Sequence, residues 1–116
     1  MIHEHLTNRL PEISELCLLH KVSKLYAFGS VVDGRFKIGK SDIDLLIEFD
    51  ETNLTKIEIS KSLLLLWIEF QKLLQSNVDL ISTSKLKGKY FKKYLDMYKI
   101  KIFDICNSDE LKVLNK

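Results

Sequence analysis

The stretch GSVVDGRFKIGKSDIDLLIEFD, residues Gly29 to Asp50, contains the features that decide the fold. In its second half the side chains alternate between an apolar face and a mainly acidic one: Ile43, Leu45 and Ile47 against Asp42, Asp44, Leu46 and Glu48. A period of two residues is typical of a β-strand with one face in the core. Residues Ser41 to Phe49 are therefore predicted to form a strand that follows a glycine-containing loop.

The chain before this stretch predicts helix and then strand. Apolar residues recur every three to four positions from Ile2 to His20, as in an amphipathic helix. Pro11 predicts either a kink or the first turn of a second helix, because proline has no amide hydrogen to donate. Residues Lys24 to Phe28 then form a short β-type run that Gly29 ends, so a first strand is expected there.

The chain after this stretch predicts a long helix and a third strand. Residues Asn53 to Gln75 include KSLLLLWIEFQKLL, which has no glycine or proline and is apolar on more than one side. This composition favours a helix buried against a sheet. Ser76 and Asn77 end the helix, and Val78 to Ser82 is predicted to be a strand.

The last part of the chain adds one helix and a short strand. Thr83 or Ser84 is expected to cap a helix that runs through Tyr98, with an apolar stripe at Leu86, Tyr90, Tyr94 and Met97. Lys99 to Phe103 is a possible strand, and a polar tail follows. The resulting order predicts an α/β (α+β) fold in which a small sheet packs with helices.

Length and composition favour one soluble domain, residues 1–116, in the cytoplasm. The chain is 46% hydrophobic and 29% charged, and its longest apolar run, Leu63 to Ile68, is too short for a membrane span. The charged N-terminus lacks the apolar core of a signal peptide. Cys17 and Cys106 are far apart in the sequence and are expected to be free thiols, with Cys17 in the core.

Charge is unevenly distributed along the chain, although the formal net charge is only +2. Residues 41–83 hold eight acids and three lysines, whereas residues 84–116 hold nine lysines and four acids. A solvated lysine-rich helix explains the second segment, and recruitment of an acidic partner is the alternative. The small net charge makes nucleic acid an unlikely main substrate.

Three acids form the candidate reactive group. Residues two apart on a strand point to the same face, so the carboxylates of Asp42 and Asp44 are expected about 6–7 Å apart. Asp79 lies in another predicted strand among apolar residues, where an unpaired buried carboxylate is costly. Three converging acids suit two Mg²⁺ ions, which prefer a few carboxylates plus phosphate oxygens. The alternative is that Asp42 caps a turn, Asp44 faces solvent and Asp79 pairs with a lysine.

Two further groups of residues carry weaker signals. Gly29 and Ser30 follow a strand, where a glycine lets the backbone approach phosphate oxygens closely, but Gly-Ser is also a common turn. The loop cations Arg35, Lys37 and Lys40 receive no fixed role. The His3-Glu4-His5 triplet lacks a third metal ligand at useful spacing and is interpreted as part of a flexible N-terminus.

Taken together, these pieces resemble the minimal nucleotidyltransferase (MNT) family of the DNA polymerase β-like superfamily. The matching segments are AFGSVVDG at 27–34, SDIDLLIEF at 41–49 and VDLIS at 78–82, with the strand-helix-strand order between them. The resemblance implies the polymerase β-like fold, a small mixed sheet with helices. It also implies that Gly29 and Ser30 bind ATP or another nucleoside triphosphate, that Asp42 and Asp44 bind Mg²⁺, and that Asp79 completes a catalytic acidic triad.

The sequence departs from the family pattern at two places. Eleven residues, Val31 to Ser41, separate the motif serine from the first aspartate, where the family usually has ten. Asp33 occupies a position at which the family tends to place a basic residue. An acid there would repel a triphosphate unless its side chain turned away.

The resemblance also implies a partner. Small MNT proteins are commonly encoded beside a helical HEPN ribonuclease, and the pair resembles a toxin-antitoxin system in which AMP is transferred to the HEPN protein. The Arg-x4-6-His pattern of HEPN proteins does not occur here, so this chain would be the antitoxin. Two alternatives stay open: a catalytically silent module that neutralises a partner by binding, and a nucleotidyltransferase that acts on a small molecule.

Overall fold

A four-stranded sheet forms the centre of the fold. The computed structural model describes residues 2–86 and 88–106. The strands are β1 (Val22–Phe28), β2 (Ile43–Phe49), β3 (Val78–Ser82) and β4 (Ile100–Asp104), and they lie side by side in the order β3-β2-β1-β4. β1 is antiparallel to both β2 and β4, whereas β2 and β3 are parallel. This arrangement confirms the predicted small mixed sheet.

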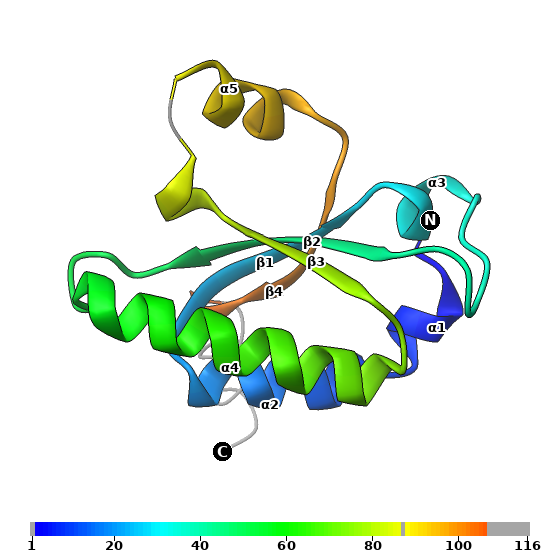
Figure 1. Cartoon of the computed structure of the whole chain (residues 1–116), viewed down its shortest axis with the longest axis horizontal. Coiled ribbons are helices and arrows are strands. Elements are labelled where there is room, and N and C mark those ends of the chain that lie inside the picture. Colours follow the sequence, from blue (N-terminus) through cyan, green and yellow to red (C-terminus); the bar gives the residue numbers. More distant parts are fainter. Residues whose placement is uncertain (1, 87, 107–116) are drawn as a thin grey trace.

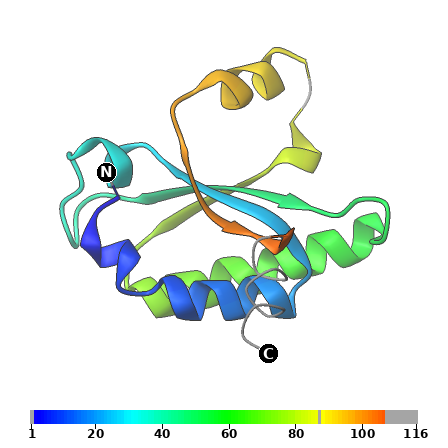
Figure 2. The same ribbon diagram turned by 180° about the vertical axis from the view of Figure 1, so that it is seen from behind.

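Helices cover the two faces of this sheet unequally. They are α1 (Glu4–Thr7), α2 (Leu10–Leu19), α3 (Ser30–Asp33), α4 (Lys56–Leu74) and α5 (Lys89–Asp96), with a 3-10 turn, η1, at Thr83–Lys85. The two long helices α2 and α4 pack against one face, and α5 lies over the other (Figures 1 and 2). Most of the core therefore lies between the sheet and α2 and α4.

The side-chain alternation of β2 places its apolar residues in this core. Ile43, Leu45 and Ile47 are fully buried, as the period of two predicted. Leu46 is also buried, although it points to the opposite face. It lines a cavity of about 110 Å³ together with Leu86 and Tyr94, so the α5 region shields this part of the second face.

The N-terminal segment forms two helices. Pro11 occupies the first turn of α2, which explains why α1 and α2 are separate elements. His20 ends α2, as predicted, and Cys17 is completely buried in the core. Burial raises the pKa of the Cys17 thiol to about 12, because the thiolate would lose its hydration.

Helix α4 begins at a capping box. The Thr55 hydroxyl accepts a hydrogen bond from the Glu58 amide, and the Glu58 carboxylate accepts one from the Thr55 amide. On the core side, Leu66 and Phe70 are fully buried. The indole Nε1 of Trp67 donates a hydrogen bond to the Val78 carbonyl oxygen (2.8 Å), which joins α4 to β3.

The prediction of a helix buried against the sheet is confirmed, and α4 also carries exposed apolar side chains that the sequence did not reveal. Five large apolar side chains on this helix are between 36% and 70% exposed: Ile57, Leu64, Leu65, Trp67 and Ile68. Only the side of α4 that faces the sheet and α2 is in the core. The rest forms an exposed apolar surface of the kind that marks interaction sites.

The predicted start of the helix from Thr83 or Ser84 through Tyr98 is wrong. Residues Thr83–Lys85 form only the 3-10 turn η1, and α5 begins at Lys89 after Gly88, which has a φ of 59°. A left-handed residue interrupts a helix, so the two pieces are separate. Of the predicted apolar stripe, Tyr94 contacts the ring of Phe28 edge-on, with 5.8 Å between ring centroids.

The predicted strand near the end of the chain is present as β4, and most of the polar tail lies outside the described residues. Within the described ranges, no helix has the length and apolar character that crossing a membrane requires.

Truncation of Leu66 tests the packing of α4 on the sheet. Because the side chain is fully buried, Leu66→Ala is expected to lower the free energy of unfolding by about 2–5 kcal/mol. Leu19 is 73% exposed, so Leu19→Ala is the matched control and is expected to change it by less than about 0.5 kcal/mol. Urea denaturation of both variants measures the difference, and equal losses would contradict the described core.

Candidate active site

Strand pairing brings the predicted site residues to one edge of the sheet, where β1 ends and β2 and β3 begin. Asp44 is the register partner of Asp79 on the parallel strand β3 and of Phe28 on the antiparallel strand β1. Residues in register on neighbouring strands point to the same face. Gly29 and Ser30 follow Phe28 directly. The acids and the Gly-Ser turn, which are up to fifty residues apart in sequence, are thus neighbours in space.

Asp44 is the electrostatic centre of this edge. Its pKa is raised to about 6 by its partial burial and by the negative charges of Asp79 and Asp42. The three acids are therefore close enough to act on one another. A carboxyl group whose pKa is raised by burial and by neighbouring acids is a common sign of a functional site.

The other two acids are more exposed than Asp44. Asp42 lies just before the first residue of β2, so the strand begins two residues later than predicted. Asp79 is exposed on the edge strand β3, and the expectation that it sits in a buried environment is wrong. β3 is apolar because its other face covers the core, whereas Asp79 points to the open face.

No basic side chain in the described part of the chain forms an ion pair with Asp42, Asp44 or Asp79, and none of the three carboxylates accepts a hydrogen bond there. The alternative in which Asp79 pairs with a lysine thus finds no support among these residues. Their negative charges are left uncompensated at one place. A bound cation is the simplest group that would compensate them.

The donor set fits a divalent cation that brings further ligands of its own. Among residues 2–86 and 88–106, no three or more histidine, cysteine, aspartate or glutamate side chains are arranged so that they could hold a metal ion, so these residues do not present a complete cage of ligands. Mg²⁺ does not need one, because it is usually bound through one or two carboxylates together with water and substrate phosphates. Carboxylates such as those of Asp42, Asp44 and Asp79 would supply oxygen ligands to such a cation.

Gly29 is packed directly against Asp44. Its φ is 71°, in the region that favours glycine, and a β-carbon at this position would collide with the Asp44 carboxylate and lie 3.3 Å from its Cγ atom. Gly29 also starts α3, since its carbonyl oxygen accepts hydrogen bonds from the amides of Val32 and Asp33. A glycine here allows the turn and the carboxylate to share one small space.

The charge of Asp33 is offset within the loop that follows. The Asp33 carboxylate accepts hydrogen bonds from the Arg35 guanidinium at 2.6 and 2.9 Å and from the Arg35 amide at 3.1 Å. These hydrogen bonds lower the pKa of Asp33 below its usual value. The acid that was expected to repel a triphosphate is therefore paired with a cation two residues away.

The N-terminal segment holds this loop in place, and sequence reasoning missed this role. Phe36 is buried against the rings of His3 and His5, with centroid distances of 5.0 and 5.7 Å. His5 Nε2 donates a hydrogen bond to the Leu74 carbonyl oxygen (2.7 Å), and the His3 amide donates one to Val31 (2.8 Å). The prediction of a flexible terminus at these histidines is wrong. The single aromatic residue in an otherwise polar loop was the available signal.

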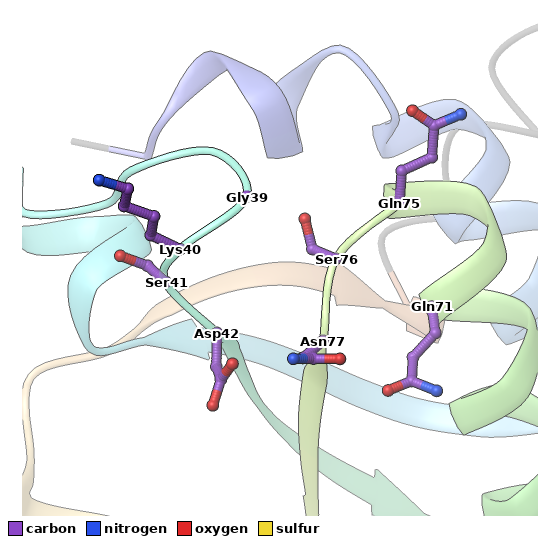
Figure 3. A pocket seen from close by; sticks show the side chains of 8 residues that line it. All are labelled: Gly39, Lys40, Ser41, Asp42, Gln71, Gln75, Ser76 and Asn77. Carbon is purple, nitrogen blue, oxygen red and sulfur yellow. The ribbon is translucent and has the colours of Figure 1, made fainter.

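A polar pocket of about 400 Å³ borders the site at Asp42. The loop contributes Lys40, Ser41 and Asp42 to one side, and the segment after α4 contributes Ser76 and Asn77 to the other (Figure 3). Gly39, Gln71 and Gln75 complete the lining. Amides and hydroxyls in this number suit a polar ligand.

The pKa of Asp44 predicts how stability depends on pH in the absence of divalent cations. The group has a higher pKa in the folded chain, so its stabilising effect is present below about pH 4 and is lost as the pH rises through about 6. Asp44→Asn removes this loss. After allowance for solvent screening, the variant is expected to be about 1 kcal/mol more stable than the wild type at about pH 7.5.

Urea denaturation in the presence of a chelator, at about pH 7.5 and about pH 4.5, measures this difference. The gain of Asp44→Asn is expected to shrink at the lower pH. Glu51→Gln removes the same charge from an exposed turn and serves as the control. A gain that does not depend on pH would show that Asp44 is not the group responsible.

Comparisons with known proteins agree with this geometry. The sequence profile of the family described as "Nucleotidyltransferase domain" matches residues 12–104. A protein of Methanocaldococcus jannaschii named "Putative protein adenylyltransferase" is 35% identical over 96 residues, which cover 75% of this chain and 91% of that protein.

Two solved structures have a similar fold. One, described as "Structure of putative minimal nucleotidyltransferase", has a TM-score of 0.59 and 30% identity, and the match covers 82% of this chain and 91% of that one. The other contains a tri-AMPylated Shewanella oneidensis HEPN toxin in complex with an MNT antitoxin. It has a TM-score of 0.56 and 19% identity, with 90% of this chain and 77% of that chain covered, and at this identity it supports the fold alone.

The profile match spans most of the chain, and the relative from M. jannaschii matches over most of its own length. These findings confirm the resemblance drawn from the three sequence segments. The chain belongs to the nucleotidyltransferase domain family and is a nucleotidyltransferase.

Proposed function

We propose that this nucleotidyltransferase is a Mg²⁺-dependent protein adenylyltransferase that transfers AMP from ATP to a HEPN-type partner and acts as its antitoxin. The observation that carries the proposal is the uncompensated group of Asp42, Asp44 and Asp79 beside the Gly29-Ser30 turn. The name of the M. jannaschii relative supports protein adenylylation. The AMPylated HEPN toxin in the Shewanella complex supports the choice of acceptor.

Each residue at the edge has a defined part in this proposal. The turn at Gly29 and Ser30 binds the β- and γ-phosphates of ATP, close to the Asp44 carboxylate. Asp42 and Asp44 hold Mg²⁺, which when bound neutralises phosphate charge and lowers the barrier to attack. In this proposal Asp79, the exposed member, accepts a proton from the acceptor hydroxyl.

In this proposal the order of the strands sets the side from which the acceptor approaches. The acceptor oxygen forms a bond to the α-phosphorus while the bond from that phosphorus to the bridging oxygen breaks and pyrophosphate leaves. Attacking and leaving oxygens lie roughly in line. Since β1 and β3 flank β2 on opposite sides, pyrophosphate at Gly29 and Ser30 implies that the acceptor approaches over β3, near Asp79.

The pairing of Asp33 with Arg35 bears on the catalytically silent alternative. That alternative rested on the extra loop residue and on repulsion between Asp33 and a triphosphate. The Arg35 guanidinium offsets this repulsion, and Phe36 anchors the longer loop to the N-terminal helix α1. Both features are therefore compatible with nucleotide binding.

Substitution of the proposed metal ligands tests the function. Wild-type protein with ATP labelled at the α-phosphate and Mg²⁺ is expected to label a co-purified HEPN-type partner. Asp42→Ala and Asp44→Ala are expected to lower the labelling rate by at least about 100-fold, because phosphate charge is no longer compensated. Asp50→Ala, at the opposite end of β2, is the matched control and is expected to retain the wild-type rate.

Labelling that survives the Asp42→Ala/Asp44→Ala double substitution would rule out the proposed site. The same double variant also decides the silent alternative. If it still protects cells from the partner, binding alone is sufficient and transfer is not the antitoxin activity.

Two glycine substitutions separate the site from ordinary backbone strain. Gly29 (φ 71°, ψ −145°) and Gly88 (φ 59°, ψ −129°) have similar backbone angles, but a β-carbon at Gly88 meets no atom within 4 Å. Both alanine variants therefore carry similar strain, and only Gly29→Ala displaces Asp44. Gly29→Ala is expected to lower kcat/KM for ATP at least about tenfold more than Gly88→Ala does. Equal effects would show that the contact with Asp44 is unimportant.

A further inference from the structure

The exposed side of α4 carries an apolar stripe that nothing in the described chain covers. Ile57, Leu64 and Ile68 are seven and four residues apart, a spacing that aligns them along one side of a helix. Their exposed fractions are 70%, 57% and 36%, whereas Leu66 and Phe70 on the core side are fully buried. α4 lies beside α2 in the helix layer and in front of it in the view of Figure 1.

A charged flank runs along one border of this stripe, and its charges are symmetric about Leu65. Lys61 and Glu69 lie four residues on either side of Leu65, and Glu58 and Lys72 lie seven residues on either side. Each residue thus has an opposite charge at the mirrored position. In the described part of the chain, Lys61, Glu69 and Lys72 form no ion pair with another residue.

This symmetry is what an antiparallel pair of identical helices requires. A twofold axis beside Leu65 places Lys61 of one copy opposite Glu69 of the other, and the reverse pair forms at the same time. The same operation brings Glu58 and Lys72 together. A parallel pair would instead place like charges opposite one another, so the flank selects one orientation.

The stripe fits the same axis. When the twofold axis is at Leu65, Leu64 and Ile68 of the second copy lie at the same levels along the helix axis as residues 66 and 62 of the first copy. The apolar side chains of the two helices therefore interleave instead of meeting head to head. Interleaved side chains are the normal packing of antiparallel helices.

The groove between α2 and α4 strengthens the charge match. It has a volume of about 450 Å³, and its charged lining residues are Glu12, Glu15, Glu69 and Lys72. The Oε2 atom of Glu12 is buried and, among the described residues, has no hydrogen-bond partner. With three acids and one lysine the groove keeps an excess of negative charge, and Lys61 of a second copy arrives at Glu69.

We propose that two copies of this chain associate through α4, in an antiparallel, twofold-symmetric pair centred on Leu65. α4 covers one face of the sheet, and Asp44 and Asp79 point from the other, so the pairing leaves both candidate active sites open. The inference does not depend on the proposed acceptor or on adenylyl transfer.

Charge exchange on the flank tests this pairing. Sedimentation equilibrium of the full chain is expected to show a species of twice the 13.6 kDa chain mass that dissociates on dilution. Lys61→Glu is expected to weaken association at least about tenfold, because it places two carboxylates opposite each other at each of the two symmetry-related contacts. The double variant K61E/E69K restores the pairs and is expected to associate within about threefold of the wild type. Lys92→Glu on α5 is the matched control and leaves association unchanged.

A crosslink at the axis gives a second measurement. In a Cys106→Ser background, Leu65→Cys is expected to join two copies through a short thiol-reactive crosslinker, since Cys17 is buried and unreactive. Leu95→Cys, exposed on α5, is expected to remain unlinked. Circular dichroism confirms that each variant is folded. A wild-type monomer at all concentrations, or a double exchange that fails to restore association, would overturn the proposal, even if another protein binds the stripe.

Discussion

Mutual repulsion among three carboxylates at one edge of the sheet is the constraint around which the site is built. Asp44 and Asp79 face each other across two parallel strands, Asp42 is near, and no described side chain offsets their charge. Residues selected only for stability would not be arranged in this way, because like charges at one place destabilise the folded chain. The register of β2 and β3, the glycine beside Asp44 and the open face above them all maintain this arrangement. A cation would turn the same repulsion into attraction.

The sequence predicted those parts that follow from local alternation. The period of two in β2 identified both its core residues and the acids opposite them, and the Gly-Ser turn after β1 marked the end of a strand. The exposure of the outer surface of α4 could not be predicted because apolar residues occupy nearly the whole circumference of that helix, so periodicity did not distinguish the core side from the exposed side. The contact of Phe36 with His3 and His5 joins segments thirty residues apart, and local patterns carry no information about such contacts.

The fold separates two surfaces of different chemistry. The open face and edge of the sheet collect acids, a glycine turn and a polar pocket, whereas the helix layer on the other face presents aliphatic side chains with charges of both signs at their border. The β2-α4-β3 crossover connects them, since one helix supplies the outer stripe and leads directly into the strand of Asp79. Such a division is compatible with the proposals that one surface pairs with a second copy and that the other binds nucleotide.

The hydrogen bond from Trp67 to the Val78 carbonyl has a practical consequence. Trp67 is the single tryptophan of the chain, and its indole is fixed one residue away from Asp79 at 40% exposure. Indole emission responds to nearby charge and to hydration. The native protein therefore contains an intrinsic fluorophore that is hydrogen-bonded to the strand of Asp79 from the helix side of the sheet, and its emission can be followed in cation or nucleotide titrations without a label or an added reporter residue.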